Sequence, residues 1–535
     1  MARRKQRDGV LALDLGTSSV RAVVYDLRGR MVAPTYTDLP YRVDTSASGQ
    51  VSSDPDAIVR LVVRSIDGAL AAARKAKLRL LAVSTSCYWH SLMGVDGRGR
   101  PTTELLTWAD TRAAQETVGL RRSEDEHAYH AVTGCFFHAS YWPAKLRWLD
   151  RSRKAAFGRT ACWIGLGEYL YERLLGARRV SLSMASATGL LDLHACRWDP
   201  AALRLAGITE ERLASLGDWS QPMRGLLPGH ARRWPELESV PWYLPLGDGA
   251  LANVGAGCVR PQWFCVTIGT SGALRVILER ASLKVPWGVW AYRLDRRRMV
   301  VGGALSEGGN VIRWLTDSLG LRHRKKVEAA AEKAAPDGHG LTILPFWAGE
   351  RSPNWRGSAR AAITGLSLAT QAGDLMRAIM ESIGYQFAAV FDAMLSTVPR
   401  PRGIVATGGR LAHSPAWSQI LADALGIRVI ESPQPEASSR GAALMALHAL
   451  GHLPGLWRQQ PSAGRTLRPR PRVHALYAAA RARQERLYQL LLPAAGEPEP
   501  ETPSATSSSS PRRRLSVARG SGSRRRSLRS RGARR

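Results

Sequence analysis

The stretch LPLGDGALANVGAGCVRPQWFCVTIGTSGALRVIL, residues Leu244–Leu278, decides the fold of this chain. It places Asp248 between two glycines, ahead of a helix of small residues, and then an apolar strand that breaks at Gly269-Thr270-Ser271 and resumes. The stretch LALDLGTSSVRAVVY, residues Leu11–Tyr25, has the same strand–turn–strand pattern around Gly16-Thr17-Ser18. An internal repeat of such a long period predicts two related domains, each with a glycine turn, and Asp248 near their junction.

Strands alternate with helices along both halves of the chain, which is typical of α/β layers. In the first half the pattern predicts a helix over residues 56–77 and a strand over 80–84. In the second half it predicts strands over 264–268 and 273–278 and a long helix over 374–395. From about Ala494 the chain becomes rich in Pro and Glu, then Ser, then Arg. Such a tail cannot bury enough apolar surface to order itself, so we expect it to be disordered.

Composition excludes several classes of protein. The chain has 535 residues with a formal charge of +32, and 44% of its residues are hydrophobic, as in ordinary globular proteins. Its six cysteines form no C-x-x-C pair, which argues against a metal–thiolate site and against a secreted disulfide framework. No apolar run is long enough for a transmembrane helix, so we predict a cytoplasmic protein that does not bind membranes.

The two glycine turns predict phosphate binding. A turn of Gly, Thr and Ser lets backbone N–H groups converge on phosphate oxygens. One isolated copy would more simply be a plain β-hairpin, but two copies in matching contexts favour the phosphate interpretation. The chain contains no Gly-Lys dipeptide and no G-x-G-x-x-G, so any nucleotide is bound without a P-loop.

Two aspartates stand beside these turns. Asp14 lies within an apolar strand, where a carboxylate needs a partner; a Mg²⁺ ion would supply one, and a hydrogen bond to its own turn is the alternative. Asp248 reads either as the N-cap of the following helix or as a general base toward a hydroxyl. The small residues after Asp248 make a helix so slim that another backbone can pack against it.

Gly408-Gly409 follows an apolar strand and precedes a helix. The pair offers a surface for a flat adenine ring, although a tight strand-to-helix turn explains it equally well. The sequence by itself leaves both interpretations open.

Together these motifs resemble the FGGY carbohydrate kinases, members of the actin/Hsp70-like ATPase superfamily. The resemblance covers roughly residues 9–455 and keeps the motifs in family order. They are LDLGTSSVRAVVYD, SLMGVDGRGRPTTELLTWADTR, GDGALANVGAGC, TIGTSG and ATGGRLAHSPAWSQILADALG.

The resemblance implies an α/β fold of two RNase H-like domains, with ATP and Mg²⁺ in an interdomain cleft. We expect an N-terminal domain over 9–246, a C-terminal domain over 247–493 and a tail over 494–535. Asp248 would be the catalytic base and Asp14 would position Mg²⁺. The implied contacts to ATP are Thr17, Ser18, Gly269, Thr270, Ser271, Gly408 and Gly409. The implied contacts to the sugar are His90, Trp108, Asp110 and Arg112, of which Arg112 could pair with a carboxylate.

Within the family, His90-Ser91, WADTR at 108–112, SMASATGLLD at 183–192 and FWAGERSPN at 346–354 look most like the gluconokinase branch. The substrate would be a sugar or sugar acid, with gluconate favoured and a pentulose, as in xylulokinases, the alternative. The chain departs from the family pattern on the sugar side, where additional aromatic residues predict a reshaped pocket. These residues are Trp89, Phe136, Phe137 and Trp142.

Two functions other than sugar phosphorylation predict different biochemical behaviour. A non-catalytic ATP-binding switch protein of the same superfamily would hydrolyse ATP without sugar. The Arg-rich tail has charge but no aromatic residue, so any nucleic-acid contact through it would be weak, salt-sensitive and sequence-blind. A homodimer is compatible with the sequence.

Overall fold

The computed structural model describes residues 7–318, 324–408 and 414–492. Gly409 and the predicted disordered tail over 494–535 lie outside the described residues. Among the described helices, none combines the length and apolar character that crossing a membrane requires.

The first half is built on a five-stranded mixed sheet with the order β14-β6-β1-β2-β3. Its central strand β1 pairs antiparallel with β2 on one side and parallel with β6 on the other. β6 is also parallel to β14, and β2 is antiparallel to β3. The strands are β1 (Arg7–Leu15), β2 (Ser19–Asp26), β3 (Thr37–Pro40), β6 (Leu78–Cys87) and β14 (Trp242–Gly247).

The second half repeats this plan in a seven-stranded sheet with the order β17-β18-β16-β15-β21-β22-β23. Its inner strand β15 pairs antiparallel with β16 and parallel with β21, which is the arrangement around β1. The strands are β15 (Trp263–Ile268), β16 (Gly272–Glu279), β17 (Trp290–Arg293), β18 (Arg298–Leu305), β21 (Gly403–Thr407), β22 (Val429–Glu431) and β23 (Thr466–Leu467). The order and directions in β3-β2-β1-β6-β14 return in β18-β16-β15-β21-β22, so the predicted pair of RNase H-like domains is confirmed.

Helices and short strands fill the connections. The helices of the first half are α1 (Pro55–Lys75), α2 (Ala114–Ser123), α3 (Glu126–Thr133), α4 (Trp142–Ser152), α5 (Lys154–Arg159), α6 (Leu166–Leu175), α7 (Leu182–Ser186), α8 (Pro200–Ala206) and α9 (Pro228–Arg233). Those of the second half are α10 (Asp248–Gly255), α11 (Gly309–Ser318), α12 (Arg324–Lys333), α13 (Ala372–Leu395), α15 (Pro415–Leu425), α16 (Ala437–Ala449) and α17 (Pro471–Leu491). The short strands are β4 (Asp44–Thr45), β5 (Val51–Ser53), β7 (Met93–Val95), β8 (Leu105–Leu106), β9 (Cys162–Ile164), β10 (Arg179–Ser181), β11 (Leu191–Asp192), β12 (Arg197–Trp198), β13 (Ser215–Gly217), β19 (Thr342–Leu344) and β20 (Ala362–Thr364).

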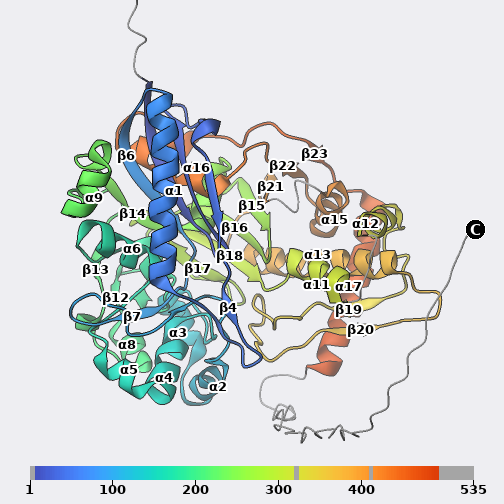
Figure 1. The fold of residues 1–535 in the computed structure, drawn as a ribbon. Helices are drawn as coiled ribbons and strands as arrows, with labels where there is room; N and C mark the ends of the chain where they lie inside the picture. Colours follow the sequence, from blue (N-terminus) through green and yellow to red (C-terminus); the bar gives the residue numbers. More distant parts are fainter. Residues whose placement is uncertain (1–6, 319–323, 409–413, 493–535) are drawn as a thin grey trace, which may run out of the picture. The chain divides into compact units, whose positions relative to one another are not determined.

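Helix α16 comes from the second half of the chain but packs on β1 and β6 of the first sheet. Figure 1 shows this orange helix beside the blue strands. The hydroxyls of Tyr25 and Ser439 lie 2.8 Å apart, and Arg440 Nε donates to the carbonyl of Gly29 over 3.0 Å. The buried side of α16 therefore belongs to the core of the first sheet.

Helices α10 and α16 touch backbone to backbone. A Cβ atom on Gly255 would lie 1.9 Å from the carbonyl oxygen of Ala437, and one on Gly441 would lie 2.0 Å from that of Leu251. The slim helix face that the sequence predicts after Asp248 is thus used for close helix packing.

This contact predicts an unusual response to Gly→Ala substitution. In a helix interior the change ordinarily stabilises by about 0.5–1 kcal/mol. Gly441→Ala and Gly255→Ala should instead lower the free energy of unfolding by about 1–3 kcal/mol, because the new methyl overpacks the helix contact. Urea denaturation measures the change.

Gly119→Ala in α2 is the matched control, because a Cβ there has no neighbour within 4 Å. It should leave stability unchanged or slightly raised. A Gly441→Ala protein as stable as the wild type would show that the two helices do not pack as described.

Candidate active site

The pairing of three parallel strands brings Asp248 to the same sheet edge as Asp14. Cys87 on β6 is paired with Leu15 on one side and with Gly247 on the other. Neighbouring strands lie about 4.8 Å apart, so the ends of β1 and β14 are about 10 Å apart. Parallel strands end at the same edge, so the first glycine turn and Asp248 leave the sheet side by side.

Asp248 is the first residue of α10, and the N-cap position belongs to Gly247. Its Oδ1 accepts a hydrogen bond from the backbone N–H of Gly249 over 2.7 Å, while Oδ2 makes none with the described residues. Removal from bulk water raises the pKa of Asp248 to about 6, and the charge of Asp14 acts in the same direction. Arg275 and the N–H of Gly249 oppose this rise. A carboxylate with a free oxygen and this pKa suits proton transfer near neutral pH.

The indole of Trp89 explains the two glycines around Asp248. A Cβ atom on Gly247 would lie 1.9 Å from this ring, and one on Gly249 would lie 2.5 Å from it. Trp89 Nε1 also donates to the carbonyl of Ser183 over 3.1 Å, which fixes the ring in place. The first of the additional aromatic residues is thus packed directly beside Asp248.

The first glycine turn is held by Tyr41, whose hydroxyl donates to the carbonyl of Gly16 over 2.6 Å. Ser18 is exposed and Thr17 is half-buried. Trp108 Nε1 donates to Thr17 Oγ1 over 3.1 Å. This bond joins the predicted sugar side to the predicted phosphate turn.

The second glycine turn is bound by the start of α11. The N–H groups of Gly309 and Asn310 donate to the carbonyls of Gly269 and Thr270 over 2.8 and 3.1 Å. A Cβ atom on Gly269 would meet no other atom within 4 Å, so the backbone here is open to close approach. The turn is therefore held by the first residues of α11, and its backbone at Gly269 is accessible to a ligand.

Each repeat has an arginine on its second strand that contacts the first strand near the turn, although the two arginines are not at equivalent positions. Arg21 on β2 pairs with Asp14 Oδ2 at 3.0 Å, while Arg275 on β16 donates to Thr267 Oγ1 over 2.6 Å. Thr267 also lies 2.7 Å from the hydroxyl of Thr407. Asp14 therefore already has one cationic partner, and its Oδ1 makes no hydrogen bond with the described residues.

Gly408 ends β21 next to the second turn. Its φ of +95° is in the left-handed region, and a Cβ atom there would lie 2.9 Å from the carbonyl oxygen of Ile268. Both backbone angle and space therefore require glycine at this position.

His90 is buried at the end of β6 with a φ of +69°. Its Nδ1 lies 2.7 Å from the carbonyl of Ala187, and burial holds its pKa well below the usual value. The neutral ring therefore donates through Nδ1–H and offers Nε2 as an acceptor. Such an acceptor suits a sugar hydroxyl.

Lys145 joins the two sugar-side segments, although the sequence motifs gave it no role. Its ammonium is completely buried and donates to the carbonyls of His90 and Thr107 over 2.8 and 2.9 Å. Burial lowers its pKa to about 7. Ser91 and Trp108 directly follow the two residues that Lys145 contacts, so the lysine side chain also helps to position them.

Asp110 and Arg112 form a pair with each other. Arg112 Nη2 lies 2.7 Å from Asp110 Oδ2, its Nε donates to both oxygens of Asp110, and its Nη1 donates to Glu104 over 2.9 Å. The guanidinium also stacks over Trp148 at 4.5 Å. All three nitrogens of Arg112 are engaged with carboxylates of the chain, so the structure does not favour its predicted pairing with a substrate carboxylate.

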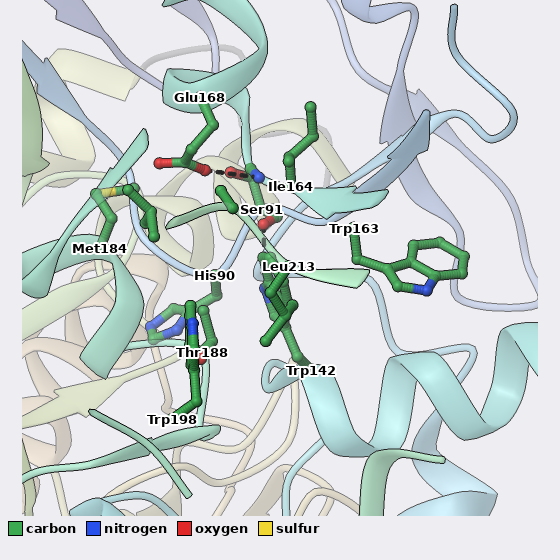
Figure 2. A pocket seen from close by; sticks show the side chains of 13 residues that line it. His90, Ser91, Trp142, Trp163, Ile164, Glu168, Met184, Thr188, Trp198 and Leu213 are labelled. Atoms are coloured by element: carbon green, nitrogen blue, oxygen red, sulfur yellow. Dashed lines mark hydrogen bonds between the residues drawn. The ribbon is translucent and has the colours of Figure 1, made fainter. Parts of the chain in front are cut away.

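A small cavity lies beside His90 (Figure 2). Trp142 fills one side and donates from Nε1 to the carbonyl of Ser91 over 3.1 Å. Glu168 accepts from the N–H of Gly165 over 2.7 Å, and burial raises its pKa to about 7. The cavity has a volume of about 10 Å³, which suits a single water molecule and is too small for a sugar.

The remaining additional aromatics stack within the core. Phe136 lies parallel to Trp355 with ring centroids 4.6 Å apart, and Phe137 stacks on Tyr129 at 4.5 Å. Phe136 thereby connects the first half of the chain to the loop that follows β19.

One other group of side chains could geometrically hold a metal ion among the described residues: Asp337, His339 and Glu381. However, Arg377 contacts Glu381 at 2.5 Å and Arg483 contacts Asp337 at 2.5 Å. The arginines neutralise both carboxylates, so this cluster is an ion-pair network between helices.

Comparison with known proteins identifies the family. Residues 9–255 match the N-terminal domain of the FGGY family of carbohydrate kinases, and residues 264–450 match its C-terminal domain. The chain belongs to the FGGY family of carbohydrate kinases. It is therefore an ATP-dependent sugar kinase that uses ATP with Mg²⁺.

Individual relatives within the family include gluconate and xylulose kinases. A gluconokinase from Bacillus subtilis (strain 168) is 29% identical over 475 residues, which cover 86% of this chain and 91% of the relative. The structure of gluconate kinase from Lactobacillus acidophilus superposes with a TM-score of 0.83 at 25% identity, covering 91% of this chain and 98% of that one. A xylulose kinase from the same organism gives a TM-score of 0.83 at 25% identity, with coverage of 91% and 99%.

The residues at the shared sheet edge fit ATP with Mg²⁺. Asp14 keeps its Oδ1 without a hydrogen bond to the described residues, and carboxylate oxygens are among the ligands that Mg²⁺ prefers. The open backbone at Gly269 and the exposed hydroxyl of Ser18 suit phosphate oxygens.

Lys145→Met should both weaken the fold and disturb the sugar side. The change leaves the buried carbonyl of His90 without its donor and the carbonyl of Thr107 with the N–H of Asp110 alone, at a cost of about 1–3 kcal/mol in the free energy of unfolding. KM for the sugar should rise while KM for ATP stays near the wild-type value. Arg147→Met on the exposed side of the same helix is the control, and unchanged stability in Lys145→Met would contradict the assignment.

Proposed function

We propose that this chain phosphorylates an aldonate, with D-gluconate as the favoured substrate and 6-phosphogluconate as the product. One observation carries the proposal: the β14–β6–β1 pairing puts Asp248 at the same edge as Asp14 and the first glycine turn. The choice of gluconate is supported by the similarity to the Bacillus gluconokinase and the Lactobacillus gluconate kinase. We keep the domain division at 246/247, so that Gly247 and Asp248 are the first residues of the second domain.

Asp248 is proposed as the general base. Its free Oδ2 accepts the proton of the sugar hydroxyl as that oxygen attacks phosphorus, and Oδ1 stays bonded to Gly249. The nearby Arg275 favours the ionised carboxylate before reaction. General base catalysis of this kind contributes about 10²–10⁴ in rate.

The two glycine turns are proposed to hold the phosphates from opposite sides. When bound, ATP·Mg²⁺ supplies the phosphoryl group and neutralises the charge that develops on it. Asp14 would hold the metal ion. The proposed ATP contacts are Thr17, Ser18, Gly269, Thr270, Ser271, Gly408 and Gly409.

His90 and Trp108 are proposed to orient the sugar. The neutral His90 accepts a hydroxyl hydrogen bond through Nε2, and Trp108 presents its ring beside the turn that it contacts through Thr17. The Asp110–Arg112 pair supports the wall of the pocket and accepts the backbone N–H of Val51 at Asp110 Oδ2 over 3.0 Å.

The pH dependence of catalysis should report Asp248. The charged and titratable groups around it are Asp14, Cys87, Tyr88 and Arg275. Because a base must be ionised and the pKa of Asp248 is raised to about 6, kcat/KM should fall about tenfold per pH unit below pH 6. Asp248→Asn should lower kcat by about 10²–10⁴-fold and remove this acid limb.

Asp392→Asn in α13 is the control for that variant, because Asp392 is exposed and, among the described residues, forms an ion pair with Arg481 alone. It should keep wild-type kinetics. Normal turnover in Asp248→Asn would exclude the base assignment.

A substrate panel tests the activity itself. Purified enzyme with ATP and Mg²⁺ should release ADP with D-gluconate at a higher kcat/KM than with D-xylulose, D-ribulose or glycerol, measured by coupled ADP detection. A higher kcat/KM for D-xylulose would replace the proposal by a pentulose kinase. ATP hydrolysis that is independent of any sugar would indicate a switch protein.

A further inference from the structure

Arg351 has a largely buried side chain that pairs with no carboxylate in the described part of the chain. It lies in the FWAGERSPN stretch between β19 and β20 and is only 8% exposed. Its Nε is buried and makes no hydrogen bond, and no ion pair joins its guanidinium to any residue in the described part of the chain. Burying an unpaired charge costs several kcal/mol, so such a group indicates an anion that arrives from outside.

The guanidinium faces the sugar side of the site. Its Cζ lies 5.3 Å from the ring centroid of Trp108 and 5.9 Å from that of Trp355. After burial, the charge of Arg351 is the next largest influence that lowers the pKa values of His90 and His138. Arg351 therefore comes from the second half of the chain to meet the sugar-side residues of the first half.

Hydrogen bonds hold the backbone that follows Arg351. The next residue, Ser352, donates its N–H to the carbonyl of Ala304 and accepts the N–H of Ala304 at its Oγ, over 3.0 and 3.1 Å. Trp355 Nε1 donates to the carbonyl of Gly288 over 3.1 Å. These bonds hold the backbone of this segment in position before any ligand binds, which reduces the ordering cost of binding.

Two acidic residues close to Arg351, its neighbour Glu350 and Glu307, are bound to other groups. Glu307 accepts the N–H of Ala348, and burial raises its pKa to about 8, so it is largely protonated at neutral pH. Glu350 accepts the hydroxyl of Tyr488, and burial raises its pKa to about 7. Neither carboxylate forms an ion pair with Arg351 in the described part of the chain, so the guanidinium keeps the capacity to pair with a ligand anion.

We propose that Arg351 binds the carboxylate of the substrate and so makes the enzyme selective for aldonates over neutral polyols. A planar guanidinium matches a carboxylate through two parallel hydrogen bonds, and Arg112 already has two carboxylate partners, Asp110 and Glu104. This inference rests on the proposed aldonate kinase activity and assigns recognition of the acid group to one residue.

The test compares D-gluconate with D-glucitol, which carries a CH₂OH group where gluconate carries the carboxylate. Wild-type kcat/KM for gluconate should exceed that for glucitol by at least about 100-fold, because the buried Arg351 is left unpaired with glucitol. Arg351→Gln should lower kcat/KM for gluconate by about 100-fold or more and change that for glucitol by only a few-fold. Arg351→Lys should retain part of the preference, since it keeps the charge but loses the paired geometry.

Thermal unfolding separates this role from a structural one. Without ligand, Arg351→Gln should melt at or above the wild-type temperature, because the substitution removes an unpaired buried charge. The rise in melting temperature that gluconate gives the wild type should be lost. A lower melting temperature together with equal losses on gluconate and glucitol would overturn the inference.

Arg360→Gln is the control, because Arg360 is exposed on the same loop and donates only to carbonyls of residues 357–359. It should leave both substrates unaffected. If the wild type acts on gluconate and Arg351→Gln matches the control, the Arg351 assignment alone is wrong. If the wild type phosphorylates D-xylulose and no aldonate, the proposed function is wrong and the inference falls with it.

Discussion

The direct backbone contact between α10 and α16 is the constraint on which the rest of the structure depends. Neither Gly255 nor Gly441 has room for a Cβ atom, so the two helix axes approach as closely as their backbones allow. Helix α16 is anchored to β1 and β6, and α10 begins with Asp248. Through this contact, Asp248 is held in a fixed place relative to Asp14 on the first sheet. The carboxylate that we propose as the general base is therefore positioned by helix packing as well as by its own strand.

The fold, and with it the sheet edge that carries Asp14, the first glycine turn and Asp248, could be predicted because the signals are local. A strand, a glycine turn and a second strand occupy adjacent residues, and the repeat of Gly16-Thr17-Ser18 at Gly269-Thr270-Ser271 implies a repeated sheet. Strand order then follows from parallel and antiparallel pairing. Asp14 on β1 and Asp248 after β14 lie at the same sheet edge with β6 between their strands. This proximity follows from the strand order and needs no side-chain detail.

The sugar side was less predictable because its contacts join residues far apart in the sequence. Arg112 matched a family motif, yet Asp110 and Glu104 engage its nitrogens, a pairing visible only once the backbone is folded. Lys145 and Arg351 carry weaker signals. Lys145 lies within the apolar face of α4, and Arg351 lies four residues from both Trp347 and Trp355 in the sequence. Burying either charge costs free energy, and a charge in such an apolar context is the signal that sequence reasoning could have used.

A structure of the enzyme with D-gluconate and a non-hydrolysable ATP analogue would test the roles proposed for Asp248 and Arg351. The account predicts the terminal hydroxyl oxygen of gluconate within about 2.6–3.2 Å of the Asp248 carboxylate. At the other end, the gluconate carboxylate should face the Arg351 guanidinium. A substrate carboxylate turned toward Asp248, or gluconate bound away from both residues, would contradict the account.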